Sequence, residues 1–353
     1  GFLAVNGLAH RYDSHYRVGE GPAGADPEIA YAAAAATALA EHFQQPFLLD
    51  RERFMARYPD SEAKTLGQIW GDRIGRFMIR ARTNDGAEPS RAGYYLGRFP
   101  RRSDALRWTP TGPLYDSVAT EPAFRPTYRR GLLPGFGMVK PWAMASGSQF
   151  RAPPFPDPRS AEFARDFVRI KTLGAADSTV RTRDETQIAF YWEDGVPGVT
   201  PPGHFTLIAM QLFQHRDMPL VDLARAMALN SIAMADAAIS SWDSKYHHDV
   251  IRPETAIRYR APDFGNPDPR VALDRGWRSL TPTPPFPAYT SGHSTFGAAS
   301  TRMIAQIMGR DDIAFSKSAA DTVLWPEHLP GVTRHWPSLS AAAEENGASR
   351  LYG

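Results

Sequence analysis

The sequence predicts an all-α fold: a helical bundle with long ordered loops, organised as a single domain over residues 1–353. Three observations support this prediction. Segments with helical periodicity or an alanine-rich body recur along most of the chain. The period-two alternation that is typical of strands is nearly absent. The Pro- and Gly-rich region 85–158 contains too many aromatic residues for a flexible linker, which favours ordered loops.

Residues 1–140 are expected to hold N-terminal helices and loops. The segment 27–43 has a proline at its first position and an alanine-rich body, as helix starts and interiors favour. The segment 60–83 begins with cap-type residues and carries a periodic apolar side. Both segments are therefore predicted helices.

Residues 141–353 are expected to form the helical core. The longest predicted helix, residues 219–246, has about seven turns at 3.6 residues per turn. Its many alanines and serines suit close packing of helices in the middle of a domain. The other predicted helices are residues 159–173, 182–194, 202–216, 291–309 and 338–353.

Composition excludes several classes of protein. The chain is 42% hydrophobic and 22% charged, with a formal net charge of +2, which is typical of a globular protein. Its basic residues, Arg129-Arg130 among them, form no polybasic stripe, so no nucleic-acid partner is expected. No apolar run reaches the roughly 18 to 20 residues of a membrane-spanning helix. The absence of cysteine excludes disulfides, thiolate zinc sites and thiol nucleophiles.

The first residue, Gly1, leads us to expect that an upstream segment was removed or left out. A chain without cysteine is compatible with an oxidising compartment. We therefore expect a secreted or periplasmic location.

Several common binding and catalytic motifs are either absent from the sequence or lack the neighbouring structure that they require. Residues 19–24 match G-x-G-x-x-G, but no strand precedes them, so they are predicted to be a loop. The chain has no E-x-x-H pairs for a di-iron bundle and no G-x-S-x-G elbow. His247 and His248 are adjacent, so on a helix they point apart and make a poor metal site.

Two cations stand near the end of the longest predicted helix. Lys245 and Arg252 are seven residues apart, which is two helical turns, so they can share a face. Pro253 disfavours helix at Arg252 and lets its guanidinium turn inward. Two converging cations repel each other unless an anion lies between them, and Arg offers a planar fork for oxyanion edges. The alternative is a pair of unrelated surface cations, because carboxylates are close by in the sequence.

The short stretch Ser291-Gly292-His293 supplies further groups for an oxyanion. Ser291 brings a hydroxyl, and Gly292 brings an unobstructed backbone N–H. The helix that starts here presents more free N–H groups and the positive end of its dipole. His293 is expected to titrate near neutrality and could then move protons for a bound oxyanion. The prolines between residues 282 and 287 are expected to fix the geometry with which the chain enters this helix.

Together and in this order, these segments resemble the superfamily of vanadium-dependent haloperoxidases and type-2 phosphatidic acid phosphatases. Its pattern is K-x6-R-P, then P-S-G-H, then S-R-x3-G-x-H. Lys245, Arg252 and Pro253 complete the first motif. The second appears as Thr290 to His293, with Thr where the family usually has Pro. The resemblance covers roughly residues 141–353 and implies the helical bundle of the haloperoxidase and acid phosphatase type.

The third motif begins with Ser349 and Arg350, and the sequence stops at Gly353. In the family, the last histidine of this motif is the vanadate ligand of peroxidases and the phosphorylated nucleophile of phosphatases. It would fall three residues past Gly353. We therefore expect no metal ligand within residues 1–353 and a ligand histidine just beyond them.

Within the superfamily, the sequence is most similar to the chloroperoxidase-like bacterial branch. Phe286 stands where the chloroperoxidases carry an aromatic residue beside the acid-base histidine, and Trp242 stands where they carry a tryptophan of the halide pocket. Both residues also fit as ordinary core aromatics. The segments 140–156 and 186–195 are similar to bacterial members as well.

The resemblance implies a vanadate-dependent haloperoxidase that oxidises halide with hydrogen peroxide to hypohalous acid. Vanadate, with phosphate as a mimic, would be held by Lys245, Arg252, Ser291, Gly292 and Arg350. His293 would accept the proton of hydrogen peroxide, and Lys245 would polarise a peroxide oxygen, so both are the predicted catalytic residues. A small organic substrate is compatible with this reaction, and the apolar helices would permit a homodimer or a higher oligomer.

Two alternatives stay open at the level of sequence. A phosphatase of the same superfamily would bind phosphate in the same pocket, because phosphate and vanadate share shape and charge. A non-catalytic homologue would result if the protein truly ended before the histidine of the third motif.

Overall fold

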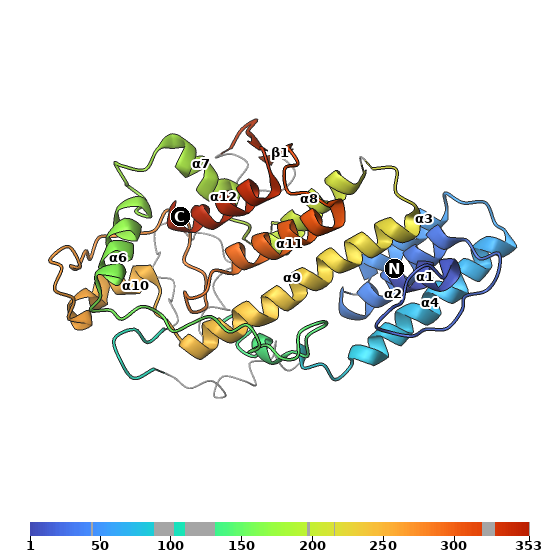
Figure 1. Cartoon of the computed structure of the whole chain (residues 1–353), viewed down its shortest axis with the longest axis horizontal. Helices are drawn as coiled ribbons and strands as arrows, with labels where there is room; N and C mark the ends of the chain where they lie inside the picture. Colours follow the sequence, from blue (N-terminus) through green and yellow to red (C-terminus); the bar gives the residue numbers. More distant parts are fainter. Residues whose placement is uncertain are drawn as a thin grey trace. The chain divides into compact units, whose positions relative to one another are not determined.

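A computed structural model describes residues 1–43, 45–87, 102–109, 131–195, 198–214, 216–319 and 329–352, except for the side chains of residues 42–48. The described chain is mostly helical, as predicted (Figure 1). It divides into two compact units. Unit 1 comprises residues 1–85 and 209–230, and unit 2 comprises residues 86–208 and 231–353. The single domain expected from the sequence stays a prediction.

Unit 1 contains four N-terminal helices: α1 (Phe2–Ala9), α2 (Pro27–Phe43), α3 (Gln45–Met55) and α4 (Glu62–Arg82). Helix α2 packs against the other three. A Cβ atom at Gly71 would lie 2.4 Å from the carbonyl oxygen of Ala30, so the close approach of α2 and α4 requires a glycine there. The Trp70 indole donates to the Ala4 carbonyl at 2.9 Å and so fixes α4 to α1.

Unit 2 carries the remaining helices and one antiparallel hairpin, β1 (Phe315–Ser318) with β2 (Thr333–Trp336). Two helices, α8 and α9, contribute residues to both units. Helix α12 packs against α11 and α7. The helices are α6 (Ala161–Leu173), α7 (Arg183–Tyr191), α8 (Thr200–Gln214), α9 (Leu220–His248), α10 (Pro253–Thr255), α11 (Gly292–Met308) and α12 (Leu339–Tyr352).

The eight predicted helices all occur, with bounds shifted by a few residues. The helix predicted over residues 182–194 ends at Tyr191, and Asp194 lies in the left-handed region with φ 51°. Residues 19–24 form a loop, as expected. The sequence did not predict α1, α3 or the hairpin. No helix in the described part of the chain is long and apolar enough to cross a membrane.

Much of the region 85–158 lies outside the described residues, but its described parts are fixed to α9 and to the chain that follows it. The N–H of Trp108 donates to Asp249, and the N–H of Ile251 donates to Leu106, at 2.8 and 2.7 Å. The carboxylate of Asp236, in the middle of α9, accepts the backbone N–H groups of residues 142–144 at 2.7 to 2.9 Å. These bonds hold the loops in place around the C-terminal end of α9.

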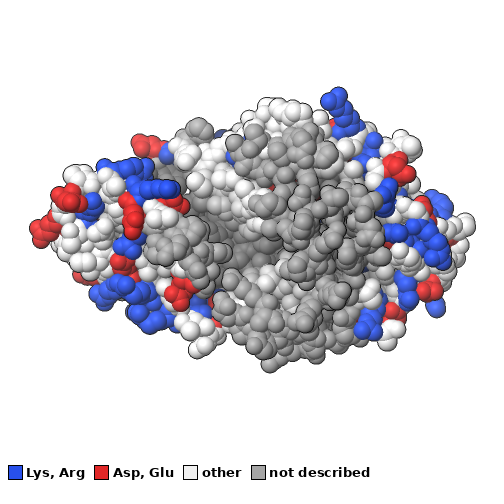
Figure 2. Space-filling view, turned by 180° about the vertical axis from the view of Figure 1, so that it is seen from behind, with Lys and Arg blue, Asp and Glu red and all other residues white. Residues whose placement is uncertain are grey.

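The charged surface agrees with the composition. Among the described residues on the face in Figure 2, basic and acidic side chains are interspersed, and neither sign forms a continuous field.

Candidate functional site

The C-terminal end of α9 positions the first cation. Lys245 is 1% exposed, and its ammonium donates to the carbonyl oxygens of Pro287 at 3.0 Å, Ala288 at 3.3 Å and Thr290. An ammonium has three donors, so these three carbonyls can take all of them. The proline-rich segment therefore wraps its backbone dipoles around the Lys245 charge.

The carboxylates that are close to Lys245 in sequence serve other partners. Asp243 forms a bidentate ion pair with Arg151, at 2.6 and 3.0 Å. The carboxylate of Asp249 accepts the backbone N–H of Arg102 at 3.1 Å. Neither carboxylate forms an ion pair with Lys245, so the buried ammonium is not neutralised by its sequence neighbours.

Arg252 follows the end of α9 in an extended conformation, with φ −78° and ψ 147°, as the proline after it favours. Its Nε donates to the carbonyl of Phe286 at 2.6 Å. Its Nη2 is buried and has no hydrogen-bond partner in the described part of the chain. A buried donor of a charged group without an acceptor is costly, which marks this atom as a contact for a ligand.

The N-terminus of α11 faces the same region. Ser291 is its N-cap, and the Oγ atom accepts from the N–H of Ser294 at 3.1 Å. The N–H groups of Gly292 and His293 belong to the first turn, so they have no acceptor within the helix. Free N–H groups and the positive end of the helix dipole together favour an anion.

The imidazole of His293 contacts the chain that follows α7. Its Nε2 lies 3.1 Å from the carbonyl oxygen of Glu193. A carbonyl only accepts hydrogen bonds, so this contact assigns the proton of the neutral ring to Nε2 and leaves Nδ1 as the basic nitrogen. Arg350, on α12, donates to the neighbouring carbonyl of Trp192 at 2.9 Å.

The three cations lie close enough to affect one another. Burial lowers the pKa of Lys245 well below its usual range, and the charges of Arg252 and Arg350 lower it further. Burial, and next the charge of Arg350, lower the pKa of Arg252 to about 9. Burial also lowers the pKa of Arg350, whereas the nearby charges of Glu193 and Asp194 raise it. No ion pair joins any of the three cations to a carboxylate in the described residues. A bound anion would relieve this repulsion.

The pKa of His293 also lies well below its usual value. Burial is the main cause, followed by the charge of Arg350, while the hydrogen bond to Glu193 acts in the opposite direction. The expectation from the sequence that His293 titrates near neutrality is therefore wrong, because burial and the charge of Arg350 lower its pKa. The imidazole is neutral near pH 7 and can accept a proton.

Aromatic rings form one wall of the site. The rings of Trp242 and Phe286 lie 5.2 Å apart, and Phe136 meets Trp242 edge-on at 6.3 Å. The ring of Phe286 also lies under Lys245 Nζ at 4.8 Å and under the Arg252 guanidinium at 4.7 Å. The site therefore combines cationic groups with an apolar ledge.

The structure brings the predicted site residues together in unit 2. They are Trp242, Lys245, Arg252, Phe286, Ser291, Gly292, His293 and Arg350. Their roles stay predictions. The described residues hold no group of three or more histidine or carboxylate side chains that could bind a metal cation.

The sequence did not predict the residues that contact the site residues from neighbouring segments. Phe136 supplies a third ring, and the carbonyls of Trp192 and Glu193 bind Arg350 and His293. Each of these contacts joins residues about 100 or more positions apart, so no local pattern reports it. The only available signal was the similarity of the segment 186–195 to bacterial haloperoxidases.

Comparison with known families confirms the resemblance. Residues 225–353 match the model of the "VCPO second helical-bundle domain". The vanadium chloroperoxidase of Curvularia inaequalis is 34% identical over an alignment of 151 residues, and the match covers 37% of this chain and 24% of that protein. The matched part of this chain thus spans about a quarter of the length of that relative.

Solved structures show the same fold over the whole chain. The first bacterial vanadium-dependent iodoperoxidase has a TM-score of 0.77 at 23% identity, covering 100% of this chain and 81% of that one. A holo-type bacterial vanadium-dependent chloroperoxidase has a TM-score of 0.74 at 19% identity, with 100% and 84% covered. The chain therefore has the vanadium haloperoxidase fold.

Proposed function

Since residues 225–353 match the model of the "VCPO second helical-bundle domain", we propose that this protein is a vanadate-dependent haloperoxidase. It would oxidise halide with hydrogen peroxide to hypohalous acid. The observation that carries the proposal is the cluster of three cations, Lys245, Arg252 and Arg350, which form no ion pair with a carboxylate among the described residues and adjoin an aromatic wall.

The donors of the site fit a vanadate ion. Arg252 offers its unpartnered buried Nη2 as a donor to an oxyanion oxygen. Ser291 offers a hydroxyl, and Gly292 offers a first-turn N–H. Arg350 keeps donors beyond the one that binds Trp192, because a guanidinium has five N–H bonds. When bound, vanadate would supply a Lewis-acid centre that activates hydrogen peroxide toward halide.

The chain's own groups would supply charge and proton transfer. His293 would accept the proton of hydrogen peroxide at Nδ1, because its Nε2 is engaged by Glu193. The donors of Lys245 are directed at three carbonyls, so its contribution would come mainly from its charge. The sequence had suggested direct polarisation of a peroxide oxygen by Lys245, which would require one of these carbonyl contacts to exchange.

The aromatic wall favours halide oxidation over phosphate-ester hydrolysis. Trp242 is 8% exposed and packs on Phe286, so the site has an apolar side on which a halide can lose water. A dry environment strengthens electrostatic interactions and protects a reactive product from side reactions. A phosphatase has no comparable need, because the reacting oxygen of its substrate is polar.

The test has two parts. The 353-residue chain should bind vanadate and phosphate in calorimetry, because the described donors are already assembled. A longer protein that includes the expected third-motif histidine should then oxidise iodide, bromide or chloride with peroxide after vanadate loading. Brisk hydrolysis of p-nitrophenyl phosphate by the metal-free protein, without halide oxidation by the loaded one, would establish a phosphatase instead. Binding without either activity would establish a non-catalytic homologue.

A further inference from the structure

A buried histidine–carboxylate pair lies directly behind the candidate site. His204 on α8 and Asp194 after α7 are both 0% exposed in their side chains, and His204 Nδ1 lies 2.9 Å from Asp194 Oδ1. An ionised carboxylate only accepts hydrogen bonds, so Nδ1 carries the proton in this contact. His204 Nε2 and Asp194 Oδ2 are buried without a hydrogen-bond partner among the described residues. The bond between the two residues therefore offsets only part of the cost of burying them, and the charge of Asp194 also lies close enough to Arg350 to raise its pKa.

Asp194 is the last residue of the segment 192–194, which makes two hydrogen-bond contacts with site residues. The carbonyl of Trp192 accepts from Arg350 Nη1 at 2.9 Å, and the carbonyl of Glu193 lies 3.1 Å from His293 Nε2. Asp194 itself has φ 51°, which costs an ordinary residue about 1 to 3 kcal/mol and which Asp tolerates better than most. This conformation persists only when surrounding contacts hold it. The pair with His204 is such a contact.

His204 also holds the other end of the segment. Its ring stacks on the indole of Trp192, with centroids 4.6 Å apart and planes 26° apart. The same indole stacks on Phe205 at 5.3 Å. His204 thus contacts residues 192 and 194, on either side of the carbonyl that binds His293.

We propose that His204 is a positioning residue for the proton acceptor of the site. Through Asp194 and the backbone of residues 192–194, it holds the Glu193 carbonyl against His293 Nε2. The proton of His293 is thereby kept on Nε2, and Nδ1 stays basic. The role in proton transfer rests on the proposed function, whereas the control of the His293 tautomer does not.

Three substitutions of His204 test which of its atoms are needed for the hydrogen bond to Asp194. His204→Phe keeps a ring but removes the donor. His204→Asn places an amide nitrogen where Nδ1 lies, and His204→Gln places it one bond further out. If the Nδ1 bond is what matters, His204→Asn should behave like the parent protein, and the Phe and Gln variants should not. Should the Phe variant fail to fold, the comparison of Asn with Gln still decides.

The main measurement is the tautomer of His293, read by nitrogen NMR on protein labelled at histidine, without turnover. His293 signals are assigned by their absence in His293→Ala. In the parent protein we expect only the Nε2–H form, and in the Phe and Gln variants a mixture of both tautomers. Tyr191→Phe is the matched control. It removes the Tyr191 hydroxyl, which donates to the carbonyl oxygen of Lys317 at 3.3 Å in the same aromatic cluster, and it leaves both members of the Asp194–His204 pair in place.

Activity of the loaded, longer protein provides the second measurement. Loss of a group that orients a reacting residue typically costs about 10- to 100-fold, so kcat for halide oxidation should fall by that factor in the Phe and Gln variants and recover in His204→Asn. An unchanged tautomer in folded Phe or Gln variants would overturn the proposal, as would a mixed tautomer in the Asn variant or in Tyr191→Phe. If the parent protein oxidises no halide, the proposed function fails, while the tautomer result still decides the role of His204.

Discussion

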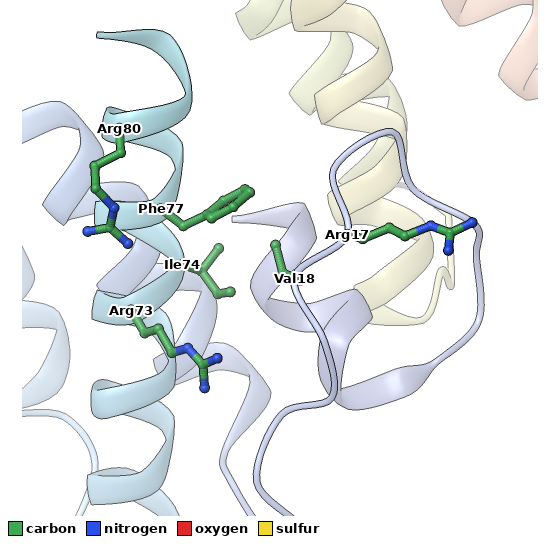
Figure 3. A pocket seen from close by; sticks show the side chains of 6 residues that line it. All are labelled: Arg17, Val18, Arg73, Ile74, Phe77 and Arg80. Atoms are coloured by element: carbon green, nitrogen blue, oxygen red, sulfur yellow. The ribbon is translucent and has the colours of Figure 1, made fainter.

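Two clusters of basic residues, one in each unit, differ in almost every property except their charge. In unit 1, Arg17, Arg73 and Arg80 line a pocket of about 240 Å³ whose other lining side chains are Val18, Ile74 and Phe77 (Figure 3). All three arginines are exposed, and Arg17 extends away from the two on α4. In unit 2, Lys245, Arg252 and Arg350 are buried or partly buried, and the pKa of each is lowered by burial; nearby cations lower the pKa of Lys245 and Arg252 further.

The difference shows that burial, more than the number of cations, makes an oxyanion site. Exposed arginines keep their hydration, and salt screens their charges over about 8 to 10 Å. The unit 2 cations have lost water, and Lys245 and Arg252 lie close to other cations, whereas only Arg350 also feels the carboxylate charges of Glu193 and Asp194. An anion that enters there gains charge-assisted hydrogen bonds that exposed arginines would not supply.

The largest effect is expected at the proton acceptor of the unit 2 cluster. His293→Ala should lower halide oxidation by roughly 10²- to 10⁴-fold, because general base catalysis contributes that much. Oxyanion binding should largely survive, since the cations and the α11 N–H groups remain. Monochlorodimedone bromination measures the first effect and calorimetry the second. A variant that brominates at the parent rate would remove His293 from the mechanism.

The next effect concerns binding. Arg252→Ala should weaken vanadate or phosphate binding by about 2 to 5 kcal/mol, because it removes a buried charged donor. Arg310→Ala, at an exposed ion pair with Asp312 in the same unit, is the matched control and should change nothing measurable. Unchanged binding in a folded Arg252→Ala protein would mean that the orphaned Nη2 does not face the oxyanion.

The sequence predicted the part of this site that lies along the chain. Lys245 and Arg252 could be paired from helical spacing and the following proline, and Ser291 to His293 from cap chemistry at a helix start. These are local rules, so one sequence suffices to apply them. The same holds for most helices, whose caps and apolar sides are visible as patterns; α1 and α3 were missed.

The remaining parts depend on contacts between distant segments. Whether Asp243 neutralised Lys245 could not be decided until its ion pair with Arg151, 92 residues away, was known. Trp192 and Glu193 bind Arg350 and His293 through backbone carbonyls, which every residue has. The residue types at these two positions therefore do not reveal these contacts. His204 looked like one histidine in an ordinary helix until its partner and its stacking were placed.

A smaller effect follows from the lowered pKa values. A bound oxyanion beside Lys245 and Arg252 raises the pKa of both side chains. At a pH between the pKa values of the free and the bound protein, binding is therefore accompanied by proton uptake. Affinity should be greatest below the free-state pKa values, which include the value of about 9 for Arg252, and should fall as pH rises from these values to the higher bound-state values. Sulfate is the suitable probe, because it keeps its charge throughout this range.

Calorimetry of sulfate in buffers with different ionisation enthalpies counts the protons. Net uptake on binding is expected, and it should shrink in Lys245→Met, which cannot titrate. Absence of proton uptake on binding would show that the cations are already fully charged in the free protein, and the contrast with the unit 1 cluster would then lose its physical basis.

The smallest effect is expected at the unit 1 cluster. The double change Arg73→Ala and Arg80→Ala removes two exposed charges without opening a cavity in the core, so the free energy of unfolding should change by no more than about 0.5 kcal/mol per site. Phosphate binding by the unit 2 cluster should be the same as in the parent protein. Any weak phosphate binding at the exposed arginines should vanish at about 0.15 M salt, where the screening length is about 8 Å, while binding at the buried cluster persists. A double variant that lost salt-resistant phosphate binding would show that exposed arginines can build an oxyanion site here, and burial would no longer explain the difference between the two clusters.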